Sequence, residues 1–404
     1  MNDQHVDLLI VGGGLTGTLL LLALANQGLR ILLVDSHPLS AKISNDFDAR
    51  TLALSSASVR ILQTMQIWPL LQPKATPIST IHVSQQQRFG SATIRSEEED
   101  PLGFVLEMQT LHQVLAQLID KQQVLAPARL TALDVKQGIA TISTDKGEQR
   151  IQAKMIVGAD GTESTVRKLS GLPVKIKDYH QQALVANIGL ARGHQEIAYE
   201  RFTKTGPIAM LPMTSARSAL VWALQPLQAE ALLALDDAAF LAALQKAFGY
   251  RLGRFTRVGT RKTFPLKQVI MPQKTAWPLV FIGNAAHTLH PVAAQGFNLG
   301  LRDVASLAQC ILQHGVNKTV LAPYQAMRKH DEQAIGQLAD SLVGIFASQL
   351  PGMAFARNLG LLAVDNIGIL KQCLMHYTRG FAGITPDLVC GITLNQGCQN
   401  EAEM

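Results

Sequence analysis

The chain is poor in charge and in cysteine, and each shortage argues against a class of protein. Charged residues make up 16% of the 404 residues, and no Lys/Arg-rich run of five or more occurs. Nucleic-acid-binding proteins show a basic stripe with interleaved aromatic residues, so we expect no nucleic-acid partner. The four cysteines form no Cys-x-x-Cys pair, and no His/Cys cluster has the spacing of metal ligands. We therefore expect reduced thiols and no metal site.

Long hydrophobic runs are missing too. The nearest approach to one, residues 19–34, is interrupted by Asn26 and Arg30, so no run of 18 apolar residues exists. Asp3 and Asp7 come too early for a targeting segment, and we expect none. The sequence thus predicts a cytoplasmic protein. Its net charge of +6 leaves open a peripheral contact with the inner face of an anionic membrane.

What the chain does have is a large apolar content in strand and helix patterns. Hydrophobic residues make up 47% of it, and its length predicts two or three domains, because single cores stop growing near roughly 250–300 residues. Val6–Val11 is typical of a buried strand, Leu15–Asn26 of a helix and Ile31–Val34 of a second strand. This order predicts a βαβ unit in a parallel sheet.

The βαβ pattern stops and returns later in the chain, which predicts a dinucleotide-binding domain with an insertion. We expect further helices at residues 51–65, 109–120, 236–248 and 297–314 and from 323 onward. Strands are expected within residues 78–104, 130–157 and 180–270 and at 279–282. The predicted dinucleotide-binding domain comprises residues 1–75, 105–175 and 274–330. A second domain comprises residues 76–104 and 176–273, and a helical region residues 331–404.

The first motif is a G-x-G-x-x-G at residues 12–17, between a predicted strand and a predicted helix. Gly12 permits the tight turn, Gly14 lets a pyrophosphate approach the backbone, and Gly17 lets the helix pack on the strand. The helix N-terminus offers free N–H groups and partial positive charge to the phosphates. Asp35, after the second strand, is placed to accept the hydroxyls of an adenosine ribose. The motif alone does not separate NAD from FAD.

Two later motifs also follow predicted strands. Asp160-Gly161 comes after an apolar strand and before a helix start at Ser164; on its own it fits an ordinary capped turn equally well. The third motif, residues 281–303, leads from a strand through small residues to a helix that begins near Gln295. The N-terminus of this helix would stabilise negative charge on a reduced flavin.

In this order and spacing, the three motifs resemble group A flavoprotein aromatic hydroxylases over nearly the whole chain. Residues 48–54 match the D-x-R-x-x-A-L pattern of the ubiquinone-biosynthesis hydroxylases, and residues 200–212 match their E-R-F-T…G-P-x-A-x-L-P. Gly283-Asn284, where most members have Gly-Asp, is similar to the subfamily of 2-polyprenyl-6-methoxyphenol hydroxylases. The resemblance implies an α/β fold: a Rossmann-like FAD-binding domain, an inserted mixed or antiparallel substrate domain and a helical C-terminal region.

The resemblance also implies the cofactors and the reaction. FAD would be resident, and NADPH or NADH would bind transiently, since only one G-x-G-x-x-G occurs. In the family, NAD(P)H reduces FAD, O2 adds at the flavin C4a, and the hydroperoxide hydroxylates a phenol in a site that excludes water. The residues implied to bind FAD are Gly12, Gly14, Leu15, Thr16, Gly17, Asp35, Arg50, Gln109, Asp160, Asn284, Gln295, Gly296, Phe297 and Asn298.

Arg50, His290 and Pro291 are implied to lie beside the flavin and to act in catalysis. His287 and His290 are either a general base or residues that hold their loop. Ala294 stands where the family usually has Gly, and Met108-Gln109 replace a usual Asn-Arg pair.

Two other functions remain open. One is a flavin oxidoreductase that does not insert oxygen, and the other is an FAD-binding subunit that organises a biosynthetic complex. A polyprenylphenol substrate, other ubiquinone-biosynthesis proteins and a homo-oligomer are the partners that the resemblance implies or allows. The apolar segments 342–346 and 359–364 fit either a surface for a membrane or partner, or a helical cap on the core.

Overall fold

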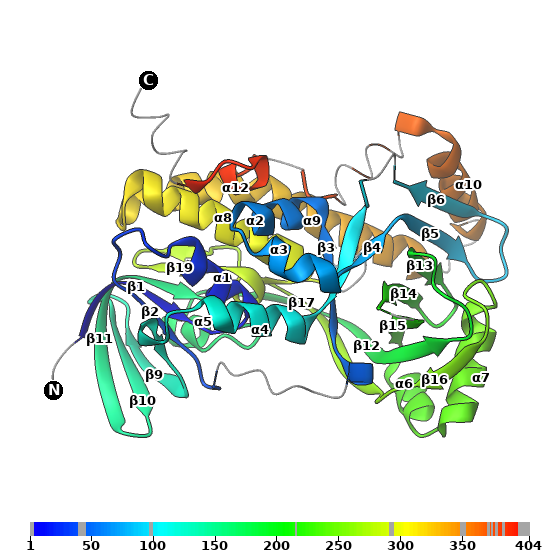
Figure 1. Ribbon diagram of the computed structural model, residues 1–404, viewed down its shortest axis with the longest axis horizontal. Coiled ribbons are helices and arrows are strands. Elements are labelled where there is room, and N and C mark those ends of the chain that lie inside the picture. Colours follow the sequence, from blue (N-terminus) through cyan, green and yellow to red (C-terminus); the bar gives the residue numbers. More distant parts are fainter. Residues whose placement is uncertain are drawn as a thin grey trace.

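Two sheets, one of eight strands and one of nine, form the two lobes of the molecule, and helices bridge them (Figure 1). This computed structural model describes residues 4–38, 46–96, 100–214, 216–290, 295–347, 353–369, 372, 375, 379–381 and 384–394. The α/β class, the second sheet and the helical C-terminal region are as predicted.

The eight-stranded sheet is parallel at its centre. Its path runs β18-β19-β11-β1-β2-β8, and β10 and β9 continue from β11 as antiparallel neighbours. The predicted strands at residues 6–11, 31–34 and 279–282 are confirmed. The bounds are β1 Gln4–Val11, β2 Ile31–Val34, β8 Val124–Leu125, β9 Ala128–Asp134, β10 Ile139–Thr144, β11 Gly147–Gly158, β18 Thr275–Ala276 and β19 Leu279–Phe281.

The carboxyl ends of three parallel strands are level with one another. Val11 of β1 pairs with Gly158 of β11, which pairs with Phe281 of β19. Each motif begins within two residues of one of these ends. Segments as far apart in sequence as Val11 and Phe281 therefore meet at one edge, which is where open α/β sheets bind ligands.

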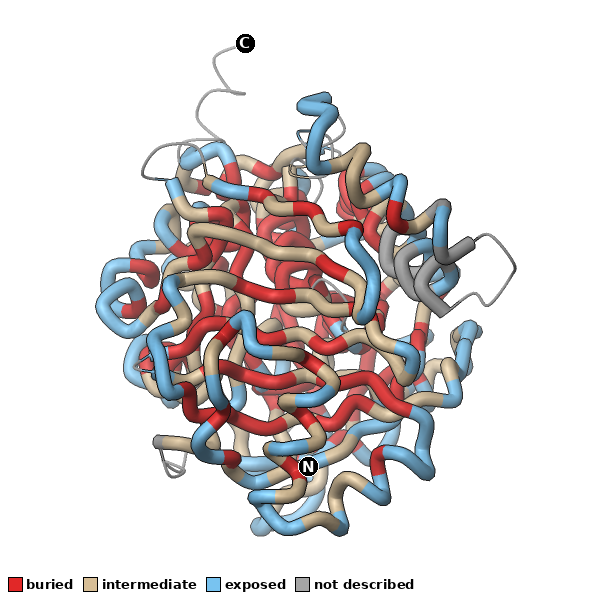
Figure 2. Tube along the Cα trace, turned by 90° about the vertical axis from the view of Figure 1, so that its right-hand side faces the viewer, coloured by how far each residue is buried: buried red, intermediate tan, exposed pale blue. Residues whose placement is uncertain are grey.

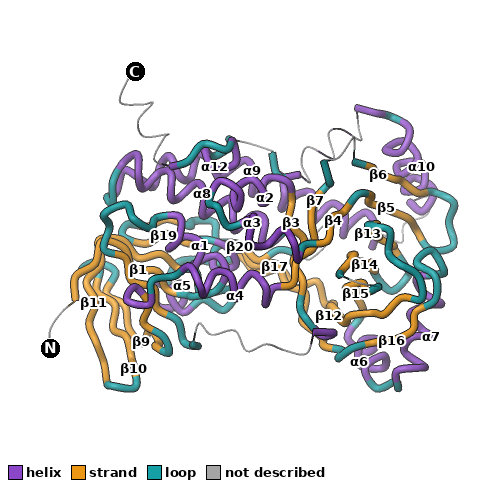
Figure 3. The backbone as a smooth tube through the Cα atoms, in the orientation of Figure 1, coloured by secondary structure: helices purple, strands orange, loops and turns teal. Residues whose placement is uncertain are grey.

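Most helices pack on one face of this sheet, whereas β9, β10 and the short helix α5 cover the other (Figure 3). The predicted helix at residues 15–26 ends at Ala23, because Asn26 and Gly28 adopt left-handed φ angles of 62° and 70°. The predicted helices at 109–120 and 297–314 are confirmed within two residues. The bounds are α1 Leu15–Ala23, α2 Ser56–Thr64, α3 Trp68–Leu71, α4 Met108–Leu118, α5 Thr165–Ser170 and α8 Gly296–His314.

The predicted helix at residues 51–65 is wrong in its first five residues. Thr51–Ser55 forms β3, which pairs antiparallel with β7 (Gly103–Glu107), and β7 also pairs with β4 (Thr76–Ile78). The α2 helix begins only at Ser56, and the Ser55 hydroxyl caps it by accepting from the Ser58 N–H. Pairing with a distant strand outweighs local helix propensity here.

The nine-stranded sheet forms the second lobe, mostly from antiparallel pairs. Its path runs β20-β17-β12-β15-β14-β13-β5-β6, with β16 paired to β12. The bounds are β5 Thr80–Gln85, β6 Ser91–Arg95, β12 Lys175–Leu190, β13 Ile197–Phe202, β14 Pro207–Met213, β15 Arg217–Leu224, β16 Phe255–Val258, β17 Lys262–Ile270 and β20 His287–Thr288.

Alternation along the strands gives this sheet an outer and an inner face. Tyr199 and Trp222 point outward and pack with Phe248 of α7. Two helices cover this face, α6 Pro226–Leu233 and α7 Asp237–Phe248, where the sequence predicted one. The inner face packs at one end on the three-stranded sheet, where Ala198 and Ala219 join Ile78 and Val105.

The predicted division into domains remains a prediction, and two strands lie across it. β4 falls in the inserted range 76–104 but pairs with β7. β20 falls in the range 274–330 but pairs with β17 of the nine-stranded sheet, through Val269 to Thr288 and Ile270 to His287. The third motif is thus attached to both sheets.

The C-terminal region comprises α9 Leu321–Ala347, α10 Met353–Asn366 and α12 Asp387–Cys390. The α10 helix lies along β6, the edge strand. Asn358 Oδ1 accepts from the Gly90 N–H and Asp365 Oδ1 from the Thr93 N–H, both at 2.8 Å. Side chains two turns apart on α10 thereby accept hydrogen bonds from two backbone N–H groups that are three residues apart at the edge of the sheet. Within the described residues, every helix is too short or too polar to pass through a bilayer.

Candidate active site

The three motifs are in direct contact at the carboxyl edge of the parallel sheet. A Cβ added to Gly12 would lie 2.5 Å from the backbone of Ala159, and one added to Gly283 would lie 2.9 Å from Thr16 Oγ1. The Ile282 N–H donates to the Gly158 carbonyl at 3.0 Å. The small residues of each motif therefore allow the other two to approach.

The glycine-rich turn has the geometry that a pyrophosphate requires. Gly12 has a φ of 112°, and a Cβ on Gly17 would lie 1.9 Å from the Gly12 carbonyl oxygen. Gly14 is the N-cap of α1 and offers no side-chain cap. A Cβ on Gly14 would meet no described atom within 4 Å. The first-turn N–H groups of a helix have no partner within the helix, so this N-terminus, with open space beside Gly14, is suited to a phosphate.

Asp35 lies directly after β2, beside the same turn. Its Oδ2 accepts from the Gly13 N–H at 2.6 Å, and its Oδ1 accepts from the His37 N–H at 2.7 Å. These bonds fix the carboxylate next to the glycine-rich turn. A carboxylate there is suited to the ribose of a bound dinucleotide.

The N-terminus of α8 is the second helix end at this edge. Gln295 is its N-cap and makes no side-chain cap bond, and a Cβ on Gly296 would meet no described atom within 4 Å. Phe297 packs against the main core. The Asn298 side chain is committed to β3: its Oδ1 accepts from the Ser55 N–H at 2.9 Å, and its Nδ2 donates to the Ala53 carbonyl. The Asn298 side chain therefore holds the start of α8 to β3, and the contact with a cofactor predicted for this residue stays a prediction.

Asn284 and Asp160 differ in their surroundings. Asn284 is exposed, and its carbonyl accepts from the Thr288 hydroxyl. Asp160 Oδ2 accepts from the Thr165 and Val166 N–H groups and so caps α5. Its Oδ1 is buried and finds no partner among the described residues. Asp160 thus has a structural role, with one acceptor remaining beside the glycine-rich turn.

Arg50, just before β3 begins, lies near Gln109, just after β7 ends. The Met108 N–H donates to the Arg50 carbonyl at 2.8 Å. The Arg50 guanidinium lies 5.6 Å from the centroid of the Phe264 ring on β17. Gln109 Nε2 donates to Glu107, which also accepts from Arg217 at 2.8 Å. Gln109, which stands where the family usually has Arg, is therefore part of a polar contact between the three-stranded sheet and the nine-stranded sheet.

His290 is buried, and its ring meets the Tyr179 ring edge-on with centroids 4.9 Å apart. This contact ties the third motif to the second lobe. Pro291 and Ala294 lie outside the described residues, so the roles predicted for them stay predictions.

A buried network of ion pairs behind the third motif was not predicted from the sequence. Asp303 accepts from the Gly283 N–H at 2.9 Å, from His287 Nε2 at 2.5 Å and from Arg328 Nε at 2.7 Å. Arg328 continues to Asp331, which also binds Arg302. Despite its burial, Asp303 has a pKa well below its usual range, because His287 and Arg328 stabilise the carboxylate. The network thus locks the Gly283-Asn284 turn to α8 and α9.

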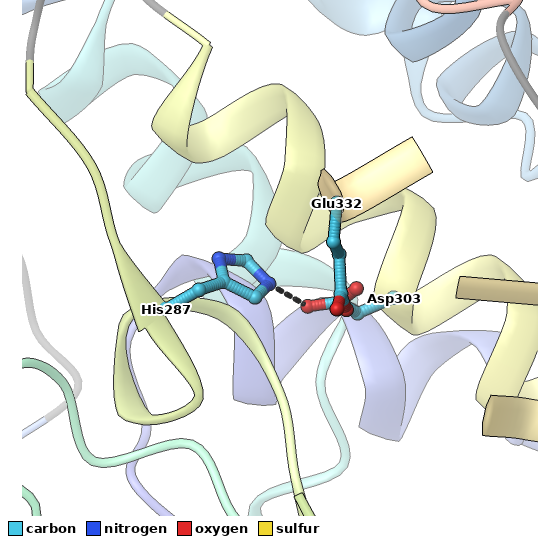
Figure 4. Close-up of side chains that lie close together, drawn as sticks. All are labelled: His287, Asp303 and Glu332. Carbon is cyan, nitrogen blue, oxygen red and sulfur yellow. Dashed lines mark hydrogen bonds and ion pairs between the residues drawn. The ribbon is translucent and has the colours of Figure 1, made fainter. Parts of the chain in front are cut away.

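His287, Asp303 and Glu332 offer ligand atoms within 4.8 Å of one another (Figure 4). The two carboxylates already have cationic partners: Arg328 binds Asp303, and Lys274 binds Glu332. A divalent cation here would face two side-chain cations. We therefore interpret this cluster as part of the ion-pair network.

Glu200 is a further residue to which the sequence analysis gave no role. Its neighbour Tyr199 points to the outer face, so Glu200 points to the inner face, level with Val83 and Ala209 on the adjacent strands. Burial raises the pKa of this carboxyl to about 7. It is an ionisable group on an otherwise apolar part of this face. Its position in a matched family motif is the one sequence signal that points to it.

The residues fit FAD as their cofactor. Two uncapped helix N-termini, two glycines with open space above them and a fixed carboxylate lie along one sheet edge, as a long dinucleotide requires. Arg50 and Gln109 lie near the N-terminus of α8. They flank a backbone hydrogen bond at the start of β3, and Asn298 of α8 is bonded to β3. The site is in contact with both sheets, through β20 on β17 and through Arg50 beside Phe264.

Comparison with known proteins agrees with this assignment. Residues 5–338 match a family described as FAD binding domain. The chain is 35% identical over 400 residues to ubiquinone hydroxylase UbiL of Rhodospirillum rubrum, covering 95% of this chain and 92% of that protein. It is 30% identical over 392 residues to 3-demethoxyubiquinol 3-hydroxylase of Escherichia coli, covering 94% and 100%.

Solved structures share the fold at low identity. Superposition on p-nitrophenol 4-monooxygenase PnpA of Pseudomonas putida gives a TM-score of 0.76 at 15% identity, covering 94% of this chain and 99% of that one. A single-substitution variant of HpxO from Klebsiella pneumoniae, complexed with FAD, gives 0.74 at 14% identity, covering 93% and 99%. From its sequence matches and its site, the chain belongs to the FAD-dependent hydroxylases of ubiquinone biosynthesis, a family in which NAD(P)H use is typical, and is a flavoprotein monooxygenase that binds FAD.

Proposed function

We propose that this protein hydroxylates the ring of a polyprenylated phenol on the route to ubiquinone. The reaction is a phenol plus O2, NAD(P)H and a proton giving the hydroxylated phenol, water and NAD(P)+. The convergence of three motifs on one sheet edge that also contacts a second sheet is the observation that carries the proposal. The ubiquinone hydroxylases that it matches over nearly their full length support the substrate class.

When bound, FAD supplies reducing equivalents and activates O2. The protein's part is to place the flavin and to exclude water. The α8 N-terminus, held by the Asp303 network and by Asn298, would stabilise negative charge on the reduced ring. The inner face carries the small side chains of Ala183, Val185 and Val221, which lie in one apolar cluster with Leu266 and Tyr179.

Arg50, His290 and Pro291 stay the residues that we propose to lie beside the flavin and the substrate. Arg50 stands at the junction of β3 and β17, and His290 lies two residues after β20, which pairs with β17, and contacts Tyr179 of β12. In His287 the Nε2 atom is bound to Asp303 inside the core. His287 therefore positions its loop, and His290 is the better candidate for contact with the substrate.

Anaerobic reduction of the holoprotein by NADPH or NADH tests the proposal. A short-chain prenylphenol should accelerate flavin reduction, and aerobic turnover should give hydroxylated phenol in proportion to NAD(P)H consumed. Turnover that yields only H2O2 would instead identify a non-hydroxylating oxidoreductase. Bound FAD that neither NADPH nor NADH reduces, with or without a phenol, would identify an organising subunit.

The matched control is Gly14→Val, which should remove the flavin and every NAD(P)H-dependent signal. Activity retained by the flavin-free variant would disconnect the reaction from this site.

A further inference from the structure

The end of the second lobe away from the eight-stranded sheet comprises the turn between β5 and β6, the end of α7 and the helix α10 (Figure 1), and exposed apolar side chains lie on these segments. Phe89, in the turn between β5 and β6, is 70% exposed, and Tyr250, after α7, is 71% exposed. Phe355 and Leu359 on α10 are 62% and 48% exposed. Figure 2 views the molecule from this end, where exposed turns surround the buried strands. Grouped apolar exposure of this kind marks an interaction site.

These segments are adjacent in space. Phe89 and Tyr250 line the same surface pocket, whose volume is about 540 Å³. The Gly90 N–H donates to Asn358 of α10 at 2.8 Å, which places the Phe89 turn against that helix. Phe355 and Leu359 are four residues apart and lie on one side of α10. The four side chains therefore surround one end of the sheet.

Three arginines, Arg88, Arg201 and Arg251, line the pocket between these side chains. Within the described part of the chain, none of them forms an ion pair with a carboxylate. Arg201 Nη1 donates to Ser84 Oγ at 3.2 Å, and its Nε is buried without a described partner. Arg251 Nη1 donates to His82 Nε2 at 3.1 Å.

The cluster has an excess of positive charge. Burial, and then the charge of Arg251, lower the pKa of both His82 and Arg201. His82 is therefore neutral and accepts from Arg251. The carboxylate of Asp365 on α10 raises the pKa of His82, but less than burial and Arg251 lower it. Asp365 also accepts from the Thr93 N–H on the strand edge. Among the described residues, the three arginines thus have no carboxylate partner, so an anionic ligand could bind them.

We propose that this arginine-aromatic end, made up of Phe89, Tyr250, Phe355, Leu359, Arg88, Arg201 and Arg251, docks the protein on an anionic phospholipid bilayer. The arginines would bind headgroup phosphates, and the apolar side chains would enter the boundary of the acyl chains. Basic and apolar side chains side by side are the composition of interfacial binding. A bilayer presents both matching layers at once, with headgroup phosphates for the three cations and acyl chains for the four apolar side chains.

The inference goes beyond the proposed reaction, because these residues lie away from the flavin edge. A bilayer is nevertheless where a polyprenylated substrate resides, so docking would bring the enzyme to it. Catalysis on a short-chain phenol in detergent-free solution should not need this end, which keeps the two proposals distinguishable.

Vesicle sedimentation of the holoprotein tests the docking surface. Vesicles of phosphatidylcholine with about one third phosphatidylglycerol should bind the protein, and binding should fall sharply between about 0.05 and 0.5 M NaCl. The double variant Arg88→Gln/Arg251→Gln should partition about 30-fold less, from about a fivefold loss for each arginine. Phe89→Ser/Phe355→Ser should also reduce binding.

Two control variants match these changes elsewhere on the surface. Ile176→Ser removes an apolar side chain that is 62% exposed, as Phe355 is. Arg129→Gln/Lys146→Gln removes two exposed cations near β9 and β10. Both should bind as the parent does. Equal loss in the controls, binding that ignores phosphatidylglycerol, or no binding at low salt would overturn the proposal, the last favouring an acidic protein partner.

Discussion

Replacing Glu200 with glutamine tests how the inner face of the nine-stranded sheet treats charge. Burial raises the pKa of Glu200 from 4.5 to about 7. One pKa unit corresponds to about 1.4 kcal/mol, so ionising this carboxyl in the folded protein costs up to about 3 kcal/mol relative to the unfolded chain. Glutamine keeps the shape and removes the ionisation.

The sign follows from the raised pKa. The folded protein binds the proton more tightly, so the stabilising contribution of protonated Glu200 is full below pH 4.5 and is lost as the pH rises through about 7. Glu200→Gln should therefore gain stability over the parent between pH 5 and pH 8. We expect the free energy of unfolding of Glu200→Gln, relative to that of the parent, to rise by up to about 3 kcal/mol from pH 5 to pH 8.

Urea unfolding of the FAD-saturated proteins, followed by tryptophan fluorescence at several pH values, measures this difference. Glu148→Gln, at an exposed carboxyl of β11, is the control and should track the parent. A Glu200→Gln difference that is the same at pH 5 and pH 8 would refute the argument that the inner face disfavours the charge.

Three further substitutions probe the edge where the motifs meet. Gly14→Val should yield folded but colourless protein, checked by flavin absorbance and circular dichroism, because its side chain would occupy the pyrophosphate position. Gly17→Ala should lower the urea midpoint by the equivalent of about 3 kcal/mol or more, since its Cβ would lie 1.9 Å from the Gly12 carbonyl oxygen. Asp303→Asn should cost about 3–5 kcal/mol because it leaves Arg328 and His287 without their buried partner. Because the pKa of Asp303 is depressed, the parent should also lose this contribution as the pH falls below 3.8, and the variant should show a flatter acid limb in the same assay.

Local patterns carried much of the prediction. Apolar runs and glycine positions predicted the strands at residues 6–11 and 31–34 and the helix between them, because a buried strand and a glycine turn leave few other conformations. The order of three motifs predicted the FAD edge, since each motif must follow a parallel strand and such strands end together.

Contacts between distant segments decided the rest. Thr51–Ser55 became a strand only because β7 supplies its hydrogen bonds. Asn298 was predicted to bind the cofactor, but its side chain is bonded to β3. Its partner Ala53 is 245 residues away in sequence, and no local pattern reveals it. The pairing of Arg302 and Arg328 with Asp303 and Asp331 requires two helices to meet in the core.

The sequence by itself therefore determined where nucleotide phosphates can approach the backbone, because glycine spacing and strand order are local properties. The tertiary structure alone decided which charges are buried together, where Glu200 faces and which arginines gather beside Phe89. These depend on side chains brought together by folding, and the energy of a charge depends on the neighbours that exclude water from it.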